Sequence, residues 1–154
     1  FLFSGTIKEN LLFGNSDATD YDISQVCKMC ELEEYINSLP LKFNTRIEEN
    51  GKNLSGGQRQ RLTIARAVVR KPDILILDDS ASALDYATDA ALRKSIREMK
   101  DAPTLFIVSQ RAASLMHADR IIVLDDGNVA GIGTHEELLK KGGIYAHYCE
   151  LSEM

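Results

Sequence analysis

The chain has 154 residues, and 18 Lys and Arg against 23 Asp and Glu give a formal net charge of −5. Proteins that bind a nucleic-acid backbone usually carry a clustered positive surplus, so this balance argues against nucleic acid as a partner. With 44% hydrophobic and 27% charged residues, the composition is that of an ordinary globular domain. The chain opens at Phe1 without an initiator Met or a leader-like segment, so we expect a piece of a longer protein.

The first part of the chain is predicted to be helical. Thr6 followed by Glu9 forms a capping box, the pattern that starts a helix, and Gly14 suits its end. A second helix is expected over residues 22–38, and Leu39-Pro40 is expected to end it. The polar residues 44–53 are predicted to form a loop.

A third helix is predicted to begin at another capping box. Ser55 is followed three residues later by Gln58, and the helical pattern continues to Arg70, just before Pro72. We therefore expect residues 1–70 to form a helical lobe.

The rest of the chain, residues 71–154, is predicted to be an α/β lobe. Three short runs are wholly apolar: residues 74–77, 105–108 and 121–124. A helix is expected between the first two, over residues 85–99. Apolar strands separated by helices favour a parallel sheet that is covered on both faces.

Two turn signals follow the third apolar run. Asp126-Gly127 predicts a hairpin into residues 129–132, because this dipeptide suits a tight two-residue turn. Thr134 with Glu137 is a further capping box and predicts a last helical region.

The cysteine spacing leaves two interpretations. Cys27 and Cys30 have the spacing of a zinc-ligand pair, yet they also lie on an apolar stripe typical of a buried helix face. Cys149 is far away in sequence, and no second pair follows. Packing in the core is the favoured interpretation.

Two consecutive carboxylates follow the first apolar run. Asp78 and Asp79 would lie at the carboxyl end of a buried strand, where open α/β sheets bind ligands. Such an apolar strand ending in acids is the Walker B pattern. Its first carboxylate, Asp78, would help to hold Mg²⁺ against nucleotide phosphates, and Asp79 would position an attacking water. The alternative is an ordinary strand end beside a helix cap.

The segment Leu54-Ser55-Gly56-Gly57-Gln58 combines flexibility with hydrogen-bond donors. Two glycines let the backbone approach a ligand closely, and the start of the following helix presents unpaired N–H groups to an anion. A simple helix cap would also explain Ser55 and Gln58, so this segment alone does not decide between the two.

The motifs taken together resemble the nucleotide-binding domain of ATP-binding cassette (ABC) transporters. They are LSGGQ at 54–58, ILILDD at 74–79, SALD at 82–85 and a switch-like strand end at 109–111. Residues 6–14 and 131–139 resemble flanking segments of the exporter-type members. The resemblance implies a P-loop NTPase-like parallel sheet, incomplete because upstream strands are absent, with an inserted helical subdomain that carries the signature loop, residues 54–58.

The resemblance also implies roles for individual residues. Leu54, Ser55, Gly56, Gly57 and Gln58 would face the ATP γ-phosphate that the opposite domain of a dimer holds. Asp78 would bind Mg²⁺, and Asp85 would be the acid of the D-loop, residues 82–85, which links the two composite sites. Residues 45–51 would touch transmembrane domains.

Two residues depart from the family pattern at the same site. Asp79 stands where the family usually has Glu, and Gln110 stands where it has the switch histidine. A shift of about 1 Å can cost on the order of 100-fold when a water must be aligned, and Gln cannot carry a proton as His does. We therefore interpret Asp79 and Gln110 as a weakened catalytic pair, as in one half of a heterodimeric exporter.

The expected function is that of an ATP-binding and ATP-hydrolysing domain of an exporter, with ATP and Mg²⁺ as cofactors. The expected partners are a second, non-identical nucleotide-binding domain and transmembrane domains, at the cytoplasmic face of the cell membrane. An alternative is a regulatory half that clamps ATP with little turnover, and a soluble cassette protein acting on ribosomes or DNA is less favoured. No GxxxxGK[ST] phosphate loop is in the sequence, so the isolated chain should bind ATP poorly.

Overall fold

The structure is a computed structural model that describes residues 1–79 and 83–152. The chain forms two compact units, residues 1–106 and residues 107–154. Each unit has a hydrophobic core of its own.

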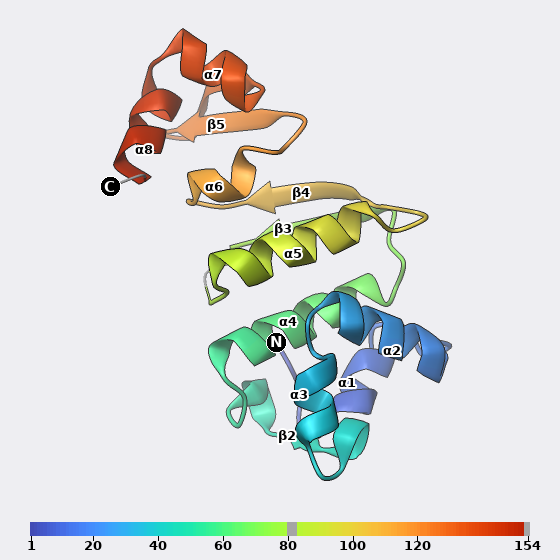
Figure 1. The fold of residues 1–154 in the computed structure, drawn as a ribbon. Helices are drawn as coiled ribbons and strands as arrows, with labels where there is room; N and C mark the ends of the chain where they lie inside the picture. The colour runs from blue at the N-terminus through green and yellow to red at the C-terminus, as the bar shows by residue number, and fades with distance from the viewer. Residues whose placement is uncertain (80–82, 153–154) are drawn as a thin grey trace. The chain divides into compact units, whose positions relative to one another are not determined.

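The first unit contains most of the helices. In chain order its elements are β1 (Gly5–Thr6), α1 (Ile7–Leu12), α2 (Asp20–Met29), α3 (Glu33–Ser38), η1 (Lys42–Asn44), β2 (Arg46–Ile47), η2 (Glu49–Gly51), α4 (Gly56–Val68), β3 (Ile74–Asp78), α5 (Tyr86–Arg97) and β4 (Thr104–Val108) (Figure 1). The last two residues of β4 belong to the second unit. That unit continues with α6 (Ala112–Leu115), β5 (Ile121–Asp125), β6 (Asn128–Gly133), α7 (His135–Lys141) and α8 (Ile144–Ser152).

The predicted capping boxes are confirmed at three helix starts. The side chains of Thr6, Ser55 and Thr134 each accept a hydrogen bond from the N–H three residues later, and the residue at that position bonds back. Thr19 and Asp22 form a fourth box at the start of α2. Local side-chain bonds therefore fix where these helices begin.

Helix α4 lies at the centre of the first unit, where α1 and α2 pack against it. Its buried side chains include Leu62, Ile64 and Val68. They join Leu11 and Ile23 of the neighbouring helices in one apolar cluster. This burial anchors the later part of α4 in the core, while the signature loop lies at the opposite end of the helix.

The predicted single helix over residues 22–38 is wrong, because the chain reverses after α2. Glu31 adopts a left-handed backbone conformation with φ of 53°. The N–H of Leu32 donates to the Cys27 carbonyl oxygen over 2.8 Å, and that of Glu31 donates to Lys28 over 3.1 Å. This is the bond pattern of a Schellman motif, which ends a helix, although the residue in the left-handed position is not the usual glycine.

The predicted loop over residues 44–53 holds regular structure. Strand β2 pairs antiparallel with β1, with Gly5 opposite Ile47 and Thr6 opposite Arg46. The η2 turn follows, and Asn50 and Gly51 within it both have positive φ. A two-residue pairing is too short to leave a period-2 pattern in the sequence.

Strands β3 and β4 form one two-stranded sheet, and the Thr104 N–H donates to the Asp73 carbonyl oxygen over 2.8 Å at its start. Leu75 and Leu77 of β3 are buried, whereas Ile76 is 65% exposed. Within the described residues only one face of β3 is covered, so the expectation of a sheet covered on both faces is not met there. The exposed apolar side chains leave a surface that another segment could cover.

The third apolar run does not join that sheet. β5 pairs with β6 in an antiparallel hairpin, in which Ile121 lies opposite Gly133 and Asp125 lies opposite Asn128. The hairpin predicted at Asp126-Gly127 is confirmed, since both residues have positive φ, as a tight turn of this kind requires. The short connection to β6 lets β5 find a local partner, which its apolar composition alone did not indicate.

Candidate nucleotide-binding site

The signature loop is organised by the start of α4. The Gln58 N–H donates to Ser55 Oγ over 3.2 Å, and the Ser55 N–H donates to Gln58 Oε1 over 2.9 Å. Leu54 packs against the core cluster, while Ser55 is exposed. The cap uses Ser55 Oγ only as an acceptor, so its hydroxyl proton remains able to donate to an anion.

The helix start also supplies backbone donors. The capping box occupies the N–H groups of Ser55 and Gln58. In a first helical turn the N–H groups of Gly56 and Gly57 have no partner inside the helix. They point out of the helix at its positive end, the arrangement that suits a phosphate oxygen.

The signature glycines pack against the D-loop segment of the same chain. A Cβ placed on Gly56 would lie 3.3 Å from the Ala83 Cβ, and one placed on Gly57 would lie 3.3 Å from the Ala83 carbonyl oxygen. These distances are shorter than most contacts that side chains make, so the close approach favours glycine at both positions. Ser82, the first residue of the SALD segment, lies outside the described residues.

Asp78 and Asp79 stand at the exposed end of β3. Asp78 is the last residue of the strand and points away from the buried face. Asp79 is also exposed, and its φ of 45° is in the left-handed region, which Asp tolerates better than most residues. Both carboxylates are therefore accessible from solvent.

An exposed carboxylate at this place fits Mg²⁺ that is bound through one protein carboxylate, phosphate oxygens and waters. The described residues hold no cluster of three or more His, Cys, Asp and Glu side chains suited to a metal ion. A dedicated all-protein metal cage is thus not seen in this part of the chain, and Asp78 fits the shared mode in which the nucleotide supplies the remaining ligands.

Gln60, a residue that the sequence did not single out, joins the two sides of this region. Its Nε2 donates to the Asp79 carbonyl oxygen over 3.2 Å, and its Oε1 accepts from the Ala83 N–H over 3.1 Å. Gln60 lies on α4, one turn after the cap. In the sequence it is one polar residue among several on a charged helix, so no pattern distinguished it.

Asp85 starts α5. Its carboxylate accepts from the Thr88 N–H over 2.9 Å and from Thr88 Oγ1 over 2.7 Å. These bonds, the backbone one first, lower the pKa of Asp85 below its usual value. The predicted D-loop acid therefore has a local structural task, which fixes the direction in which α5 leaves the D-loop.

The catalytic candidate Gln110 follows β4 in the second unit. It is exposed, and beside it the Arg111 N–H donates to Ser109 Oγ over 3.0 Å. Residues 54–58, Asp78, Asp79 and Asp85 all belong to the first unit. The first unit thus brings together the signature loop, the strand end and the D-loop, and Gln110 is described with the second unit.

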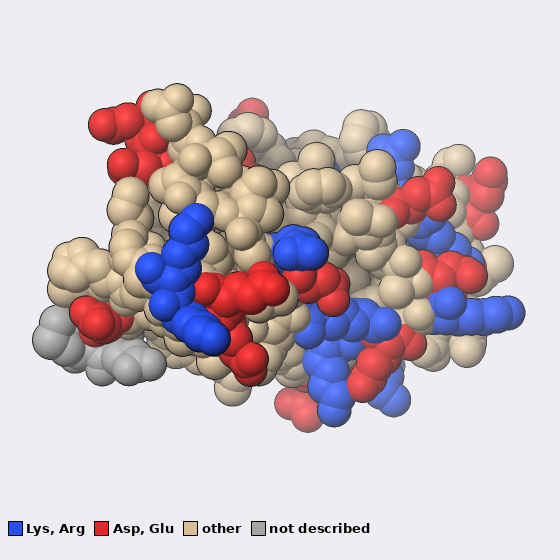
Figure 2. All heavy atoms as spheres, turned by 90° about the horizontal axis from the view of Figure 1, so that it is seen from above, with Lys and Arg blue, Asp and Glu red and all other residues tan. Residues whose placement is uncertain are grey.

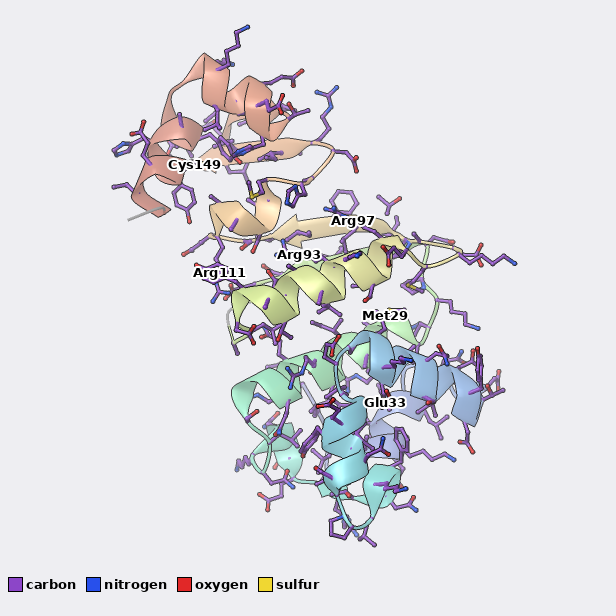
Figure 3. The ribbon with its side chains drawn as sticks, in the orientation of Figure 1. Met29, Glu33, Arg93, Arg97, Arg111 and Cys149 are labelled. Carbon is purple, nitrogen blue, oxygen red and sulfur yellow. The ribbon has the colours of Figure 1, made fainter. Side chains whose placement is uncertain are left out.

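Helix α5 contains a second feature that the sequence did not reveal, a buried ion pair between Asp89 and Arg93 one turn apart. Arg93 is labelled on this helix in Figure 3. Removing one member would leave the other charge buried, so the pair fixes this helix face in the first unit. On the face drawn in Figure 2, acidic and basic side chains are interspersed.

Cys27 and Cys30 are buried in the core of the first unit, as the apolar stripe predicts. Burial raises the pKa of the Cys27 thiol to about 12 and also raises that of Cys30. Thiolates bind zinc, so these protonated, enclosed thiols are poor ligands.

Comparison with known proteins agrees with these features. A family profile described as "ABC transporter" matches residues 2–82. The chain is 46% identical over 153 residues to a probable multidrug resistance ABC transporter ATP-binding/permease protein of Bacillus subtilis, covering 99% of this chain and 26% of that protein. It is 44% identical over 148 residues to a putative export ATP-binding/permease protein of Rickettsia felis, covering 96% of this chain and 26% of that protein.

A solved structure supports the same assignment. A bacterial Atm1-family ABC exporter with ATP bound superposes with a TM-score of 0.95 and 33% identity, over 99% of this chain and 27% of that one. The chain belongs to the ABC transporter family and has the α/β fold of part of its nucleotide-binding domain. It spans about a quarter of the length of the relatives that it matches.

Proposed function

We propose that this chain is part of the ATP-binding and ATP-hydrolysing domain of an exporter. The observation that carries the proposal is the start of α4, where the Ser55 hydroxyl and two glycine N–H groups are presented next to Ala83 of the D-loop. These donors suit the γ-phosphate of an ATP held by a second, facing domain. The names of the relatives, multidrug and export ATP-binding/permease proteins, favour export as the process that the ATP drives.

Each site residue has a task in this proposal. Leu54 anchors the signature loop to the core, and Ser55, Gly56 and Gly57 donate to phosphate oxygens of the facing site. In the chain's own site, Asp78 holds Mg²⁺ together with the phosphates, and Asp79 and Gln110 orient the attacking water. Asp85 keeps the D-loop directed toward the interface through its bonds to Thr88.

We also propose the setting of the domain. None of the helices in the described part of the chain has the length and apolarity needed to span a bilayer. The transmembrane partners are expected elsewhere in the longer protein, with residues 45–51 facing them at the cytoplasmic side of the membrane. The exposed apolar face of β3 would be covered by the part of the nucleotide-binding domain that carries the phosphate loop. The division into a helical lobe, residues 1–70, and an α/β lobe, residues 71–154, stays a prediction.

Asp79 and Gln110 favour a finer proposal, that the chain's own site is degenerate and its partner domain is not identical. The left-handed backbone at Asp79 suits Asp better than Glu, so the shorter carboxylate matches the conformation of this turn. The signature loop, which serves the facing site, keeps its cap and its glycines. In the alternative, the chain clamps ATP without useful turnover and supports hydrolysis by its partner.

The test is steady-state ATP hydrolysis by the complete polypeptide that carries this segment, purified without other nucleotide-binding subunits, at saturating Mg-ATP. A degenerate site predicts negligible turnover that rises at least about tenfold when Asp79→Glu and Gln110→His are combined. The matched control is Asp73→Glu, which lengthens an exposed carboxylate just before β3 and should change nothing.

The other results separate the proposals. Brisk turnover by the unaltered polypeptide would support the ATPase function and overturn the degenerate site. Turnover that stays absent in the double variant, and also after a second nucleotide-binding subunit is added, would overturn the ATPase function itself. Turnover that appears only with the second subunit would favour the clamping half.

A further inference from the structure

We propose that Gln60 is a positioning residue that couples the signature loop to the Walker B strand end within one chain. The inference rests on the proposed ATPase function and deepens it. Gln60 bonds to the backbone on both sides of the connection between β3 and α5, at Asp79 and at Ala83. One rigid amide group therefore fixes two points of the segment that leads from the catalytic strand to the D-loop.

The bond to Asp79 is made at a residue whose left-handed backbone has few alternative conformations. The φ of 45° at Asp79 sets the direction of its carbonyl oxygen, and Gln60 Nε2 holds that oxygen over 3.2 Å. Since φ and the carbonyl direction together determine where the side chain points, the bond restrains the carboxylate that would orient water. Loss of the bond would let the peptide rotate and move the carboxylate.

The bond to Ala83 acts beside the signature loop. The Ala83 N–H is held by Gln60 Oε1 over 3.1 Å, while the Ala83 carbonyl oxygen and methyl group lie against the positions of Gly57 and Gly56. Ala83 is thus in contact with α4 at two successive turns. A displacement of the signature loop would be transmitted to Ala83 by packing and to Asp79 through Gln60.

The start of α4 is suited to transmit such a displacement. The helix is anchored by buried residues on its core side, including Leu62, Ala65 and Val68. Gln60 is half-buried and lies on the same helix, between the signature loop and these buried residues. A phosphate that engages the signature loop at the facing site would therefore bias the strand end of the chain's own site. We infer that this contact links the two composite sites of a dimer through α4.

The test uses the complete transporter with Gln60→Leu, which removes both hydrogen bonds, and Gln60→Glu, which keeps the acceptor for Ala83 and loses the donor to Asp79. The matched controls are Gln25→Leu and Gln25→Glu at an exposed position of α2. Turnover is expressed per bound nucleotide, so that unfolded protein does not contribute. Both variants are made in the Asp79→Glu and Gln110→His background, in which the chain's own site is expected to turn over. There we expect Gln60→Leu and Gln60→Glu to lower kcat at least about tenfold, with KM for ATP changed less than about twofold.

Hydrogen exchange of the peptide that contains Ala83 provides a readout that does not depend on activity. The Ala83 amide should exchange at least about tenfold faster in Gln60→Leu and at the original rate in Gln60→Glu. If Gln60→Leu does not fold, the Gln60→Glu variant still separates the two bonds, since it should lower kcat while Ala83 stays protected.

Some results would overturn the inference and leave the proposed function intact. One is a kcat within twofold of that of the background protein in a Gln60→Leu protein whose Ala83 amide exchanges faster. Another is a kcat within twofold of that of the background protein in folded Gln60→Glu. Unchanged Ala83 exchange in Gln60→Leu would also overturn it, because the bond would not restrain the D-loop. An unaltered transporter that hydrolyses no ATP with all its subunits present would overturn the proposed function, and the inference with it.

Discussion

The side chain of Asn10 pairs with the backbone of Phe3 through two hydrogen bonds. The Phe3 N–H donates to Asn10 Oδ1 over 3.2 Å, and Asn10 Nδ2 donates to the Phe3 carbonyl oxygen over 3.0 Å. Asn10 Nδ2 also donates to the Thr6 carbonyl oxygen over 3.1 Å. Asn10 is fully buried, so α1 is joined to the segment before it, residues 3–6, by a polar group that water does not reach.

Asn10→Ala should destabilise the first unit, because it leaves the Phe3 backbone groups without their partner. The expected loss is about 1–3 kcal/mol in the free energy of unfolding, the usual cost of an unsatisfied buried polar group. Urea unfolding followed by circular dichroism measures it. Asn37→Ala at an exposed position of α3 is the control, and equal midpoints for the two variants would contradict the prediction.

The ion pair between Asp22 and Lys71 predicts a loss of stability in acid. Lys71 Nζ lies 2.8 Å from Asp22 Oδ1, and this bond, followed by those from Thr19, lowers the pKa of Asp22 well below its usual range. A depressed carboxyl pKa contributes stability above the unfolded pKa of about 3.9, and that stability is lost as the pH falls toward the folded pKa.

The urea midpoint should therefore fall between pH 5 and pH 2.5, and it should fall less in Asp22→Asn. Asp17→Asn, an exposed residue just before α2, serves as the control and should keep the full pH dependence. A pH profile of Asp22→Asn identical to that of the original chain would show that this pair contributes nothing.

Gly57→Ala should impair ATP hydrolysis by the complete transporter more than it impairs folding. The added methyl carbon would lie 3.3 Å from the Ala83 carbonyl oxygen, so either the signature loop or the D-loop must shift. We expect kcat to fall by about 10-fold to 100-fold, with an unchanged melting temperature within about 3 °C. Ala90→Ser on an exposed position of α5 should leave both quantities unchanged.

Cys27 and Cys30 should resist alkylation as long as the first unit is folded. Both thiols are buried, and burial raises the pKa of each, so the reactive thiolate is scarce at pH 8. Iodoacetamide labelling followed by mass spectrometry should modify them only after denaturant is added. Ser16→Cys, at an exposed position, provides a thiol that reacts at once. Labelling of Cys27 at the same rate would mean that the helix face opens readily.

The sequence predicted those parts of the fold that depend on neighbouring residues. The capping boxes at Thr6, Ser55 and Thr134 each need only the residue three positions later, and all are confirmed. The break at Glu31 was missed because a non-glycine residue took the left-handed position. The hairpin of β5 and β6 was predicted from its turn, but its separation from the sheet of β3 and β4 was not, because apolar composition does not specify a partner.

The candidate site shows the same contrast between local patterns, which the sequence reveals, and contacts between distant residues, which it does not. The motifs, taken together, singled out residues 54–58 and the two carboxylates at the end of β3, Asp78 and Asp79, as candidates. Gln60 was missed because its two partners are backbone groups of Asp79 and Ala83, far along the chain. Backbone partners leave no trace in the identities of the residues that supply them.

The capping boxes also bear on synthesis of the protein. Helices α1, α2, α4 and α7 begin at side-chain pairs that lie within four residues of each other. As the chain leaves the ribosome, each start signal is complete almost as soon as it emerges, and α1 and α2 precede the α4 helix against which they pack. Helices α1 to α4 are thus available before β3 is made. A ribosome-bound chain that ends after residue 70 should already hold nascent helices at the starts of α1, α2 and α4, before Asp78 and Asp79 are made.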